Sequence, residues 1–303
     1  MPPPQSSRIA TRLATITLAI ASLLILPGCG QSADIPTPPT PTSPKPTMPI
    51  HQAVAKGNLQ EVESNVEWGA DPNVRNRVEQ TPLHIAMRND SYEICEYLIA
   101  HGADINASDE KGHTPLHIAS RNGARTLAKL LIDLGADLEA ISNMGNTPLH
   151  EAMVLDSSLM ASLLLNNGSL VNARNDADAT PLILASVLGY RDIAEVLIKN
   201  DADLELQDGQ GETACHKAAK YNHRFFLEYL IPAGANANAK DKYGDTPLHK
   251  AANYGQTDAI EYLILNGADV FAVNNRGVSS LTYAIQADES EAVDMLVRYG
   301  AGR

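Results

Sequence analysis

The sequence predicts an all-α solenoid of eight 33-residue helix-turn-helix units, and three periodic features lead to this fold class. Thr-Pro-Leu-His occurs at 81–84, 114–117, 147–150 and 246–249, always a multiple of 33 residues apart. A second marker, of the type Gly135-Ala136, keeps the same step. Each unit also carries an apolar stripe at helical spacing, such as Leu127, Leu130 and Leu131. Because one pair of short helices cannot bury its own stripe, we expect consecutive units to stack.

The first 28 residues are typical of a secretory signal that is removed from the mature protein. Arg8 and Arg12 are the only charges in this stretch, and Leu13 to Leu26 runs fourteen residues without a charge. That length matches the roughly 7–15 apolar residues of a cleavable signal and falls below the about 20 residues that a membrane-spanning helix needs. An uncleaved anchor is the weaker alternative.

The segment Leu26-Pro27-Gly28-Cys29-Gly30 resembles the bacterial lipobox, in which the Cys is lipidated and becomes the mature N-terminus. Pro27 departs from the Ala, Ser or Thr that is usual before the small residue. Several acyl chains on Cys29 would make a durable anchor, since each buried methylene contributes about 0.8 kcal/mol. Gly30, by the same resemblance, favours export to the outer membrane, facing the periplasm. A free Cys29 beside an ordinary secretory cleavage site is the alternative.

Residues 29–47 are predicted to be the lipidated Cys29 followed by a Pro-rich linker. The stretch from Gly30 to Thr47 contains six prolines and a single basic residue, Lys45. This composition favours polyproline II at about 3.1 Å per residue, so the linker could span up to roughly 55 Å. We interpret it as a spacer before a folded domain over residues 48–303. The alternative is a Pro-rich ligand for a partner domain.

One unit, Thr114 to Asp137, shows how the sequence specifies its helices. Thr114 is suited to cap a first helix whose opening turn tolerates Pro115, and we expect this helix to end near Gly123. Gly135 supplies a left-handed residue that closes the second helix. The same 33-residue frame locates four degenerate copies of the motif, at 48–51, 180–183, 213–216 and 279–282.

These phased motifs resemble the ankyrin-repeat family over residues 48–303. The resemblance implies a stack of helix pairs with β-hairpin fingers that project to one side. The departures fall in repeats five and six, where we expect changes in local geometry. Ile183 and Ala214 break the Thr-Pro-Leu-His signature, and Asp201 replaces the closing Gly. Pro232 lies in the last turn of a predicted second helix, where it removes a backbone hydrogen bond.

Charge and motif content argue against nucleic-acid binding and against catalysis. The net charge of −13 leaves no positive field that would attract phosphates. The sequence contains no phosphate loop, nucleophile elbow or zinc motif, and we expect no cofactor and no metal. The segment Asp208 to Glu212 resembles part of a calcium loop but lacks the third acidic ligand, so we expect a turn. Cys95 and Cys215 fall on apolar repeat positions and are predicted to be reduced core residues.

The histidines are predicted to be structural. Six of the nine share one repeat position, and the family resemblance implies that this His hydrogen-bonds the neighbouring turn. Copies about 10 Å apart are too separated to share a metal ion. The six are His51, His84, His117, His150, His216 and His249.

The family resemblance also implies contact positions for a protein partner, four, three and one residue before the Thr and seven and eight after it. Repeats two and three place a basic cluster at these positions, repeats four and five an apolar stretch, and repeats six and seven a tyrosine group. The basic cluster is Arg77, Arg88, Lys111 and Arg121; the apolar stretch is Met144, Val154, Leu155, Ala177, Val187 and Leu188; the tyrosine group is Lys220, Tyr221, Tyr243 and Tyr254.

The predicted function is therefore a non-enzymatic protein-binding scaffold, held in the bacterial cell envelope by its lipid anchor alone. We expect an unidentified protein partner to place an apolar ridge on repeats four and five and acidic groups against the basic cluster. The tyrosine group of this chain would act as anchors on the other side of the ridge. Alternatively, Val187 and Leu188 pack on the adjacent helix and the arginines are merely solvated. Two other functions remain open: an immunity or inhibitor protein that blocks a toxin or enzyme, and an envelope enzyme that uses exposed carboxylates.

Overall fold

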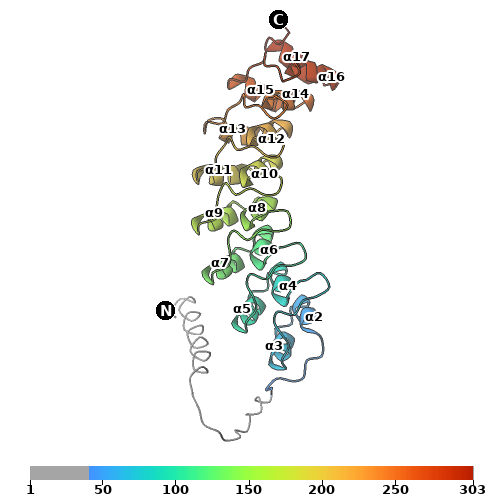
Figure 1. The fold of residues 1–303 in the computed structure, drawn as a ribbon, viewed down its shortest axis with the longest axis vertical. Coiled ribbons are helices and arrows are strands. Elements are labelled where there is room, and N and C mark those ends of the chain that lie inside the picture. Colours follow the sequence, from blue (N-terminus) through green and yellow to red (C-terminus); the bar gives the residue numbers. More distant parts are fainter. Residues whose placement is uncertain (1–40, 303) are drawn as a thin grey trace. The chain divides into compact units, whose positions relative to one another are not determined.

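The computed structural model describes residues 41–302, so the predicted signal peptide and Cys29 lie outside the described residues. The chain divides into two compact units, Met1–Asp104 and Ile105–Arg303. Over residues 41–302, sixteen α-helices form eight consecutive pairs (Figure 1). The first unit contains α2 (Ile50–Ala55), α3 (Leu59–Glu67), α4 (Pro82–Arg88) and α5 (Tyr92–Ala100).

The second unit is a stack of helix pairs in which each first helix packs on the next first helix and each second helix on the next second helix. The first helices are α6 (Pro115–Asn122), α8 (Pro148–Ala152), α10 (Pro181–Leu188), α12 (Ala214–Lys220), α14 (Pro247–Asn253) and α16 (Ser280–Gln286). The second helices are α7 (Arg125–Asp133), α9 (Ser158–Asn166), α11 (Arg191–Lys199), α13 (Arg224–Leu230), α15 (Thr257–Leu265) and α17 (Ser290–Arg298).

The apolar stripe of each second helix is buried as its spacing predicts. Leu127 and Leu131 of α7 are fully buried, while Leu130 between them is half-buried. Small residues from the neighbouring first helices, such as Ala119 and Ala152, are also fully buried. Alanine allows close helix packing, so this core needs few aromatic side chains.

The first helices begin at capping boxes built from the repeated Thr and His. At Thr246 the hydroxyl caps the backbone of His249, while His249 Nδ1 accepts a hydrogen bond from the Thr246 backbone N–H at 3.1 Å. The other ring nitrogen, Nε2, lies 3.1 Å from the carbonyl oxygen of Val278, in the turn before the next repeat. A carbonyl can only accept, so His249 must be neutral, with its proton on Nε2. The predicted structural role is confirmed here.

The same His contact to a turn 29 residues ahead recurs along the chain. In four of these histidines, burial lowers the pKa of the imidazole and outweighs the opposite effect of the carbonyl hydrogen bond. The four are His117, His150, His216 and His249. They therefore remain neutral at physiological pH and act as cross-links between consecutive repeats.

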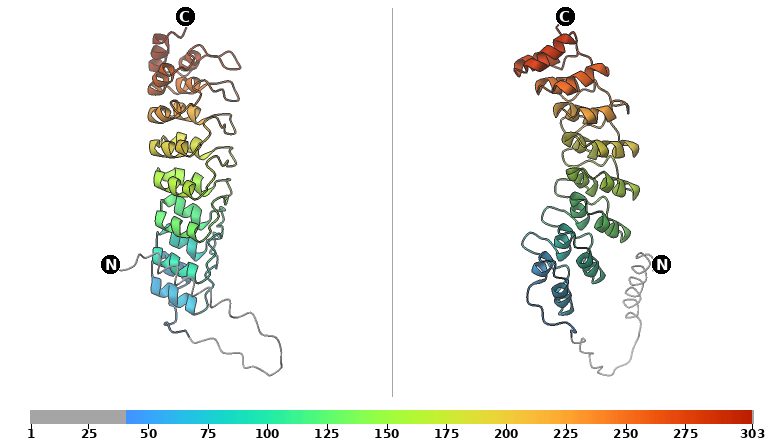
Figure 2. Two further views of the ribbon diagram at one scale, coloured as in Figure 1. Left: turned by 90° about the vertical axis from the view of Figure 1, so that its left-hand side faces the viewer. Right: turned by 180° about the vertical axis from the view of Figure 1, so that it is seen from behind.

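The fingers are the turns that precede each first helix, such as residues 109–113 and 241–245. In the second of these, the backbone N–H of Gly244 donates to Asp241 O at 2.9 Å, and the N–H of Asp241 donates to Asp245 O at 2.9 Å. Within residues 41–302 these turns contain no β-strand, and one isolated bridge pairs Val273 with Ser279. The expected β-hairpins are thus not confirmed as paired strands. Figure 2 shows the fingers of the second unit projecting from one side of its helices.

Successive fingers of the second unit are joined by main-chain hydrogen bonds. In each, a backbone N–H near the start of one finger donates to a carbonyl at the tip of the previous finger. The bonds, at 2.8–3.3 Å, run from Asn143 to Lys111, Asp176 to Met144, Gly209 to Ala177, Lys242 to Gln210 and Asn275 to Tyr243. Four of these five tips are followed by a glycine that has no room for a side chain: a Cβ on Gly244, for example, would lie 2.7 Å from the backbone nitrogen of Asn275. The tip at Ala177 is instead followed by Asp178, and there the glycine is Gly209 of the next finger.

We expect Gly244→Ala to destabilise the protein by about 2–3 kcal/mol, because it adds this backbone clash to the strain of a left-handed conformation. Gly267→Ala is the matched control. Gly267 also has a positive φ, of 93°, but a Cβ there would meet nothing within 4 Å, so only the strain of about 1 kcal/mol should apply. Urea denaturation followed by circular dichroism measures both changes, and equal losses would show that the fingers do not touch as described.

The sequence departures in repeats five and six are accommodated by the local backbone. Asp201 takes the left-handed conformation of the Gly that it replaces, with φ of 61°. Pro232 shortens its helix: α13 ends at Leu230 after seven residues, whereas the neighbouring second helices α11 and α15 have nine. In repeat four, α8 ends at Ala152 and the chain continues in a short 3₁₀ helix over Met153–Leu155.

The end of the predicted linker lies against α3 in the first unit. The Thr47 backbone N–H donates to Glu61 at 2.9 Å, and the Ser43 N–H donates to Glu67 at 3.0 Å. The Trp68 indole N–H in turn donates to the Ser43 carbonyl at 3.1 Å. Residues 42–47 therefore form a strap on the first repeat, and only the chain before residue 42 can act as the spacer. None of the helices between residues 41 and 302 is both long and apolar enough to span a bilayer.

Candidate protein-binding surface

The apolar stretch is exposed at five of its six positions in the second unit. Met144 and Ala177 are exposed at fingertips, Met144 to 70%. Val154, Leu155 and Leu188, at or beyond the ends of first helices, are exposed as well. Val187 is only half-buried, and its carbonyl accepts a hydrogen bond from His223 at 2.9 Å. Val187 is thus partly covered, whereas Leu188 is open to solvent.

The basic cluster is divided between the two units. Arg77 and Arg88 are exposed in the first unit, on the finger before α4 and in the last turn of α4. Lys111 and Arg121 are exposed in the second unit, on the finger before α6 and in the last turn of α6. The four side chains therefore form a basic pair in each unit.

Arg121 is engaged by a buried carboxylate of the same unit. Its Nε lies 3.0 Å from Glu151, whose side chain is 2% exposed. Burial alone would raise the pKa of Glu151, but hydrogen bonds from His113 and Asn146 and the charge of Arg121 outweigh burial and lower that pKa to about 2. Glu151 thus stays ionised and neutralises the charge of Arg121, one of the four basic residues expected to meet an acidic partner.

The tyrosine group includes two rings that lie around the Lys220 ammonium. Tyr221, Tyr243 and Tyr254 are all exposed. The ammonium of Lys220 lies 5.3 Å from the centre of the Tyr221 ring and 5.1 Å from that of Tyr254. Both distances are within the range of a cation-π interaction, so Lys220 and the two rings fix one another's positions.

A network of buried charges lies beneath the tyrosines. Lys250 of α14 is 15% exposed and lies 2.6 Å from Asp241 and 3.0 Å from Glu212. Lys217 of α12 binds Glu212 as well and lies 2.7 Å from Asp208. The carboxylates come from the fingers before α12 and α14, so the network ties two fingers to two helices.

The ion pairs raise the pKa of Lys250 and lower the pKa of Glu212. Burial alone would lower the pKa of Lys250, but hydrogen bonds with Asp241 and Glu212 outweigh it and hold that pKa above its usual range. Burial would raise the pKa of Glu212, but Lys217 and Lys250 outweigh it and lower that pKa to about 2. Lys250 and Glu212 therefore stay charged around neutral pH.

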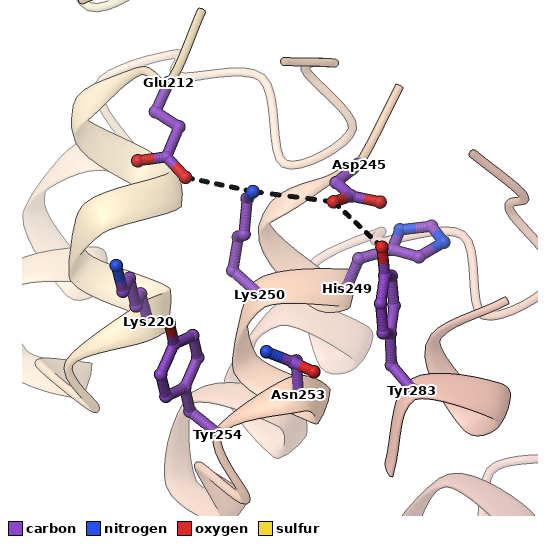
Figure 3. A pocket seen from close by; sticks show the side chains of 8 residues that line it. All are labelled: Glu212, Lys220, Asp245, His249, Lys250, Asn253, Tyr254 and Tyr283. Carbon is purple, nitrogen blue, oxygen red and sulfur yellow. Dashed lines mark hydrogen bonds and ion pairs between the residues drawn. The ribbon is translucent and has the colours of Figure 1, made fainter. Parts of the chain in front are cut away.

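A small pocket opens between α12, α14 and α16 over this network (Figure 3). Its volume is about 90 Å³. Asp245 contributes to its wall and accepts hydrogen bonds from Asn274 at 2.7 Å and from the Tyr283 hydroxyl at 3.3 Å. The lining residues are Glu212, Lys220, Asp245, His249, Lys250, Asn253, Tyr254 and Tyr283.

Comparison with known families agrees with this geometry. A family model of ankyrin repeats in three copies matches residues 50–142, 139–208 and 215–302. The chain belongs to the ankyrin-repeat family. No curated protein matches the chain.

The ankyrin frame also shows which functional residues the sequence analysis missed. Glu151, Lys217 and Lys250 all lie four residues after the Thr, a position that was not among the contact positions considered. Other ankyrin units of this chain carry Ile118 or Leu184 there. A charged residue at a position that is apolar in repeats two, three and five was the signal that could have revealed the buried networks.

The other candidate sites have structural roles in the ankyrin fold. Cys95 and Cys215 are buried and free, as predicted for core residues. The resemblance to a calcium loop is explained by the finger, in which Asp208 and Glu212 bind Lys217. No group of His, Cys, Asp and Glu in the described range has an arrangement that could hold a metal ion.

Proposed function

We propose that this protein is a non-enzymatic ankyrin module that binds a protein partner and is anchored as a lipoprotein in the bacterial cell envelope. Ankyrin repeats are generally protein-protein interaction modules. The fold supplies stacked first helices and fingers as a continuous scaffold for contact residues.

One observation carries the binding half of the proposal. Large apolar and aromatic side chains are exposed at the family's variable contact positions of repeats four to seven. They are Met144, Val154, Leu155, Leu188, Tyr221, Tyr243 and Tyr254. Exposed apolar patches with polar rims mark interaction sites, and tyrosine is enriched among residues that dominate binding energy.

A crosslinked pull-down tests this half. We expect a partner captured from membrane fractions by the wild-type protein to be lost, by more than tenfold in yield, with the double variant Leu188→Asp/Tyr254→Ala. Both side chains are exposed, so the variant should fold normally, which circular dichroism checks. The matched control is Phe225→Asp, an exposed apolar position on second helix α13, which should leave capture unchanged. Equal capture by all three proteins would remove this surface from consideration.

The anchoring half rests on the sequence around Cys29. We expect the wild-type chain, expressed in a bacterial host, to incorporate an alkyne-tagged fatty acid and to sediment with membranes. Cys29→Ser should abolish both properties, because it removes the thiol that carries the lipid. Export to the outer membrane is tested by density-gradient separation of the membranes. A membrane-bound Cys29→Ser protein would instead indicate an uncleaved signal anchor.

A further inference from the structure

The pocket between α12, α14 and α16 has its own recognition chemistry, which deepens the proposed function and rests on it. The pocket lies beside Tyr254, one of the proposed contact residues. Its polar groups fall into two classes: those whose hydrogen-bonding capacity is used inside the protein and those that are free to bind a guest.

The carboxylates of the pocket are already satisfied. Glu212 is bound by both Lys217 and Lys250. Asp245 accepts from Asn274 and Tyr283 and lies 3.5 Å from the Lys250 ammonium (Figure 3). Neither offers an unpaired charge to a guest cation. Lys250 is likewise paired with carboxylates, whereas the Lys220 ammonium has no carboxylate partner among the described residues.

The donors of the pocket are free. Over residues 41–302, the Lys220 ammonium, the Asn253 amide and the Tyr254 hydroxyl have no hydrogen bond or ion pair to another group of the protein. Lys220 is half-buried, and its ammonium is positioned by the Tyr221 and Tyr254 rings. An ammonium held in place and partly shielded from water binds an anion more strongly than one on a mobile surface side chain.

The pocket has room for a small polar group of a partner. Its volume of about 90 Å³ exceeds the roughly 10–15 Å³ that one water molecule needs. A single carboxylate group with its methylene therefore has room beside the Lys220 ammonium.

We propose that the pocket receives the side-chain carboxylate of an Asp or Glu of the protein partner. The carboxylate accepts from Lys220, with Asn253 and Tyr254 as further donors. Apolar residues flanking it on the partner segment cover the exposed rings of Tyr221 and Tyr254. At repeats six and seven, the unpaired positive charge that the partner meets is thus supplied by Lys220, whereas the charge of Arg121 is neutralised by Glu151.

Selection from a library of random 12-residue peptides displayed on phage tests the assignment with the full chain as bait. We expect enriched peptides to carry an Asp or Glu at a fixed position among apolar residues. For a synthetic peptide of this kind, replacing the acidic residue with its amide should weaken binding about tenfold. With Lys220→Gln the acidic and amide peptides should bind equally, within about twofold. Lys199→Gln, the same charge change on second helix α11, should preserve the tenfold preference.

Two kinds of outcome would overturn the carboxylate site and leave the proposed function standing, and a third would contradict both. Peptides that lose binding with Leu188→Asp/Tyr254→Ala but show no acidic preference would refute the carboxylate site and keep the binding surface. An acidic preference that survives Lys220→Gln, or that disappears when the peptide's C-terminal carboxylate is amidated, would assign recognition to another group. Failure to enrich any peptide would contradict both the site and the surface.

Discussion

Replacing Lys250 with Met is expected to lower the free energy of unfolding by about 3–5 kcal/mol. Lys250 is the ammonium on which Glu212, Asp241 and Asp245 converge, and its side chain is 15% exposed. Without it, these carboxylates would face one another in a poorly hydrated site, with Lys217 as the remaining ammonium of the network. Breaking a buried ion pair by removing one partner is costly because the remaining charge is left uncompensated.

Urea denaturation of the purified protein at pH 7.5 measures the effect. Lys199→Met is the matched control, because Lys199 forms a single exposed ion pair with Glu195 and its loss should change little. A second variant, Lys250→Met/Asp241→Asn, should recover part of the lost stability by removing one repelling charge. If Lys250→Met unfolds at the same urea concentration as Lys199→Met, the network contributes nothing to stability.

Acidification from pH 7.5 to pH 5 is expected to destabilise the protein steeply, in a window set by the four histidines whose pKa is lowered. In the unfolded chain each has a pKa near 6.5, whereas in the folded chain burial keeps it neutral to lower pH. The unfolded chain therefore binds more protons below pH 6.5. Stability is fully present above that pH and is lost as the pH falls toward the folded pKa values. Each His contributes up to about 1.4 kcal/mol per pH unit, so the four together reach about 5 kcal/mol per unit.

The free energy of unfolding measured at successive pH values checks this expectation. His150→Gln should be less stable than wild type at pH 7.5 but should show a slope shallower by about a quarter. Glu151 and Glu212, each with a pKa of about 2, act in a separate window, since their contribution is lost only below about pH 4.5. Constant stability between pH 7.5 and pH 5 would contradict the neutral, cross-linking histidines.

Much of the fold could be predicted from the sequence because its determinants are local and repeated. The cap at Thr114, the helix end at Gly123 and the left-handed residue at Gly135 each depend on neighbouring residues alone, and the structure confirms all three. The repeat position of Leu188 left exposure and packing on the adjacent helix as alternatives, and the structure shows exposure.

The rest of the candidate site could not be predicted, because it depends on which side chains meet between repeats. Lys250 reaches Glu212, which lies 38 positions earlier in the chain, and nothing local to either residue specifies the pair. Arg121 was expected to be free for a partner, yet Glu151, thirty positions later, lies beside it. Each finger is closed by a hydrogen bond such as the one from the Asp241 N–H to the Asp245 carbonyl. This bond brackets a turn of five residues, which is too short to contain a pair of strands.

The strap over residues 42–47 determines in which order a pull on the predicted linker would break contacts with the folded domain. A pull on the chain before residue 41 would reach the folded domain first through the contacts of Thr42 and Ser43 with Glu67 and of Ser43 with Trp68. Only after these contacts break would the load pass to the two hydrogen bonds between Thr47 and Glu61, and then to the Met48 carbonyl, which accepts from the Asn65 amide at 2.9 Å. The pull is therefore resisted by three side chains of α3 before helix α2 carries force.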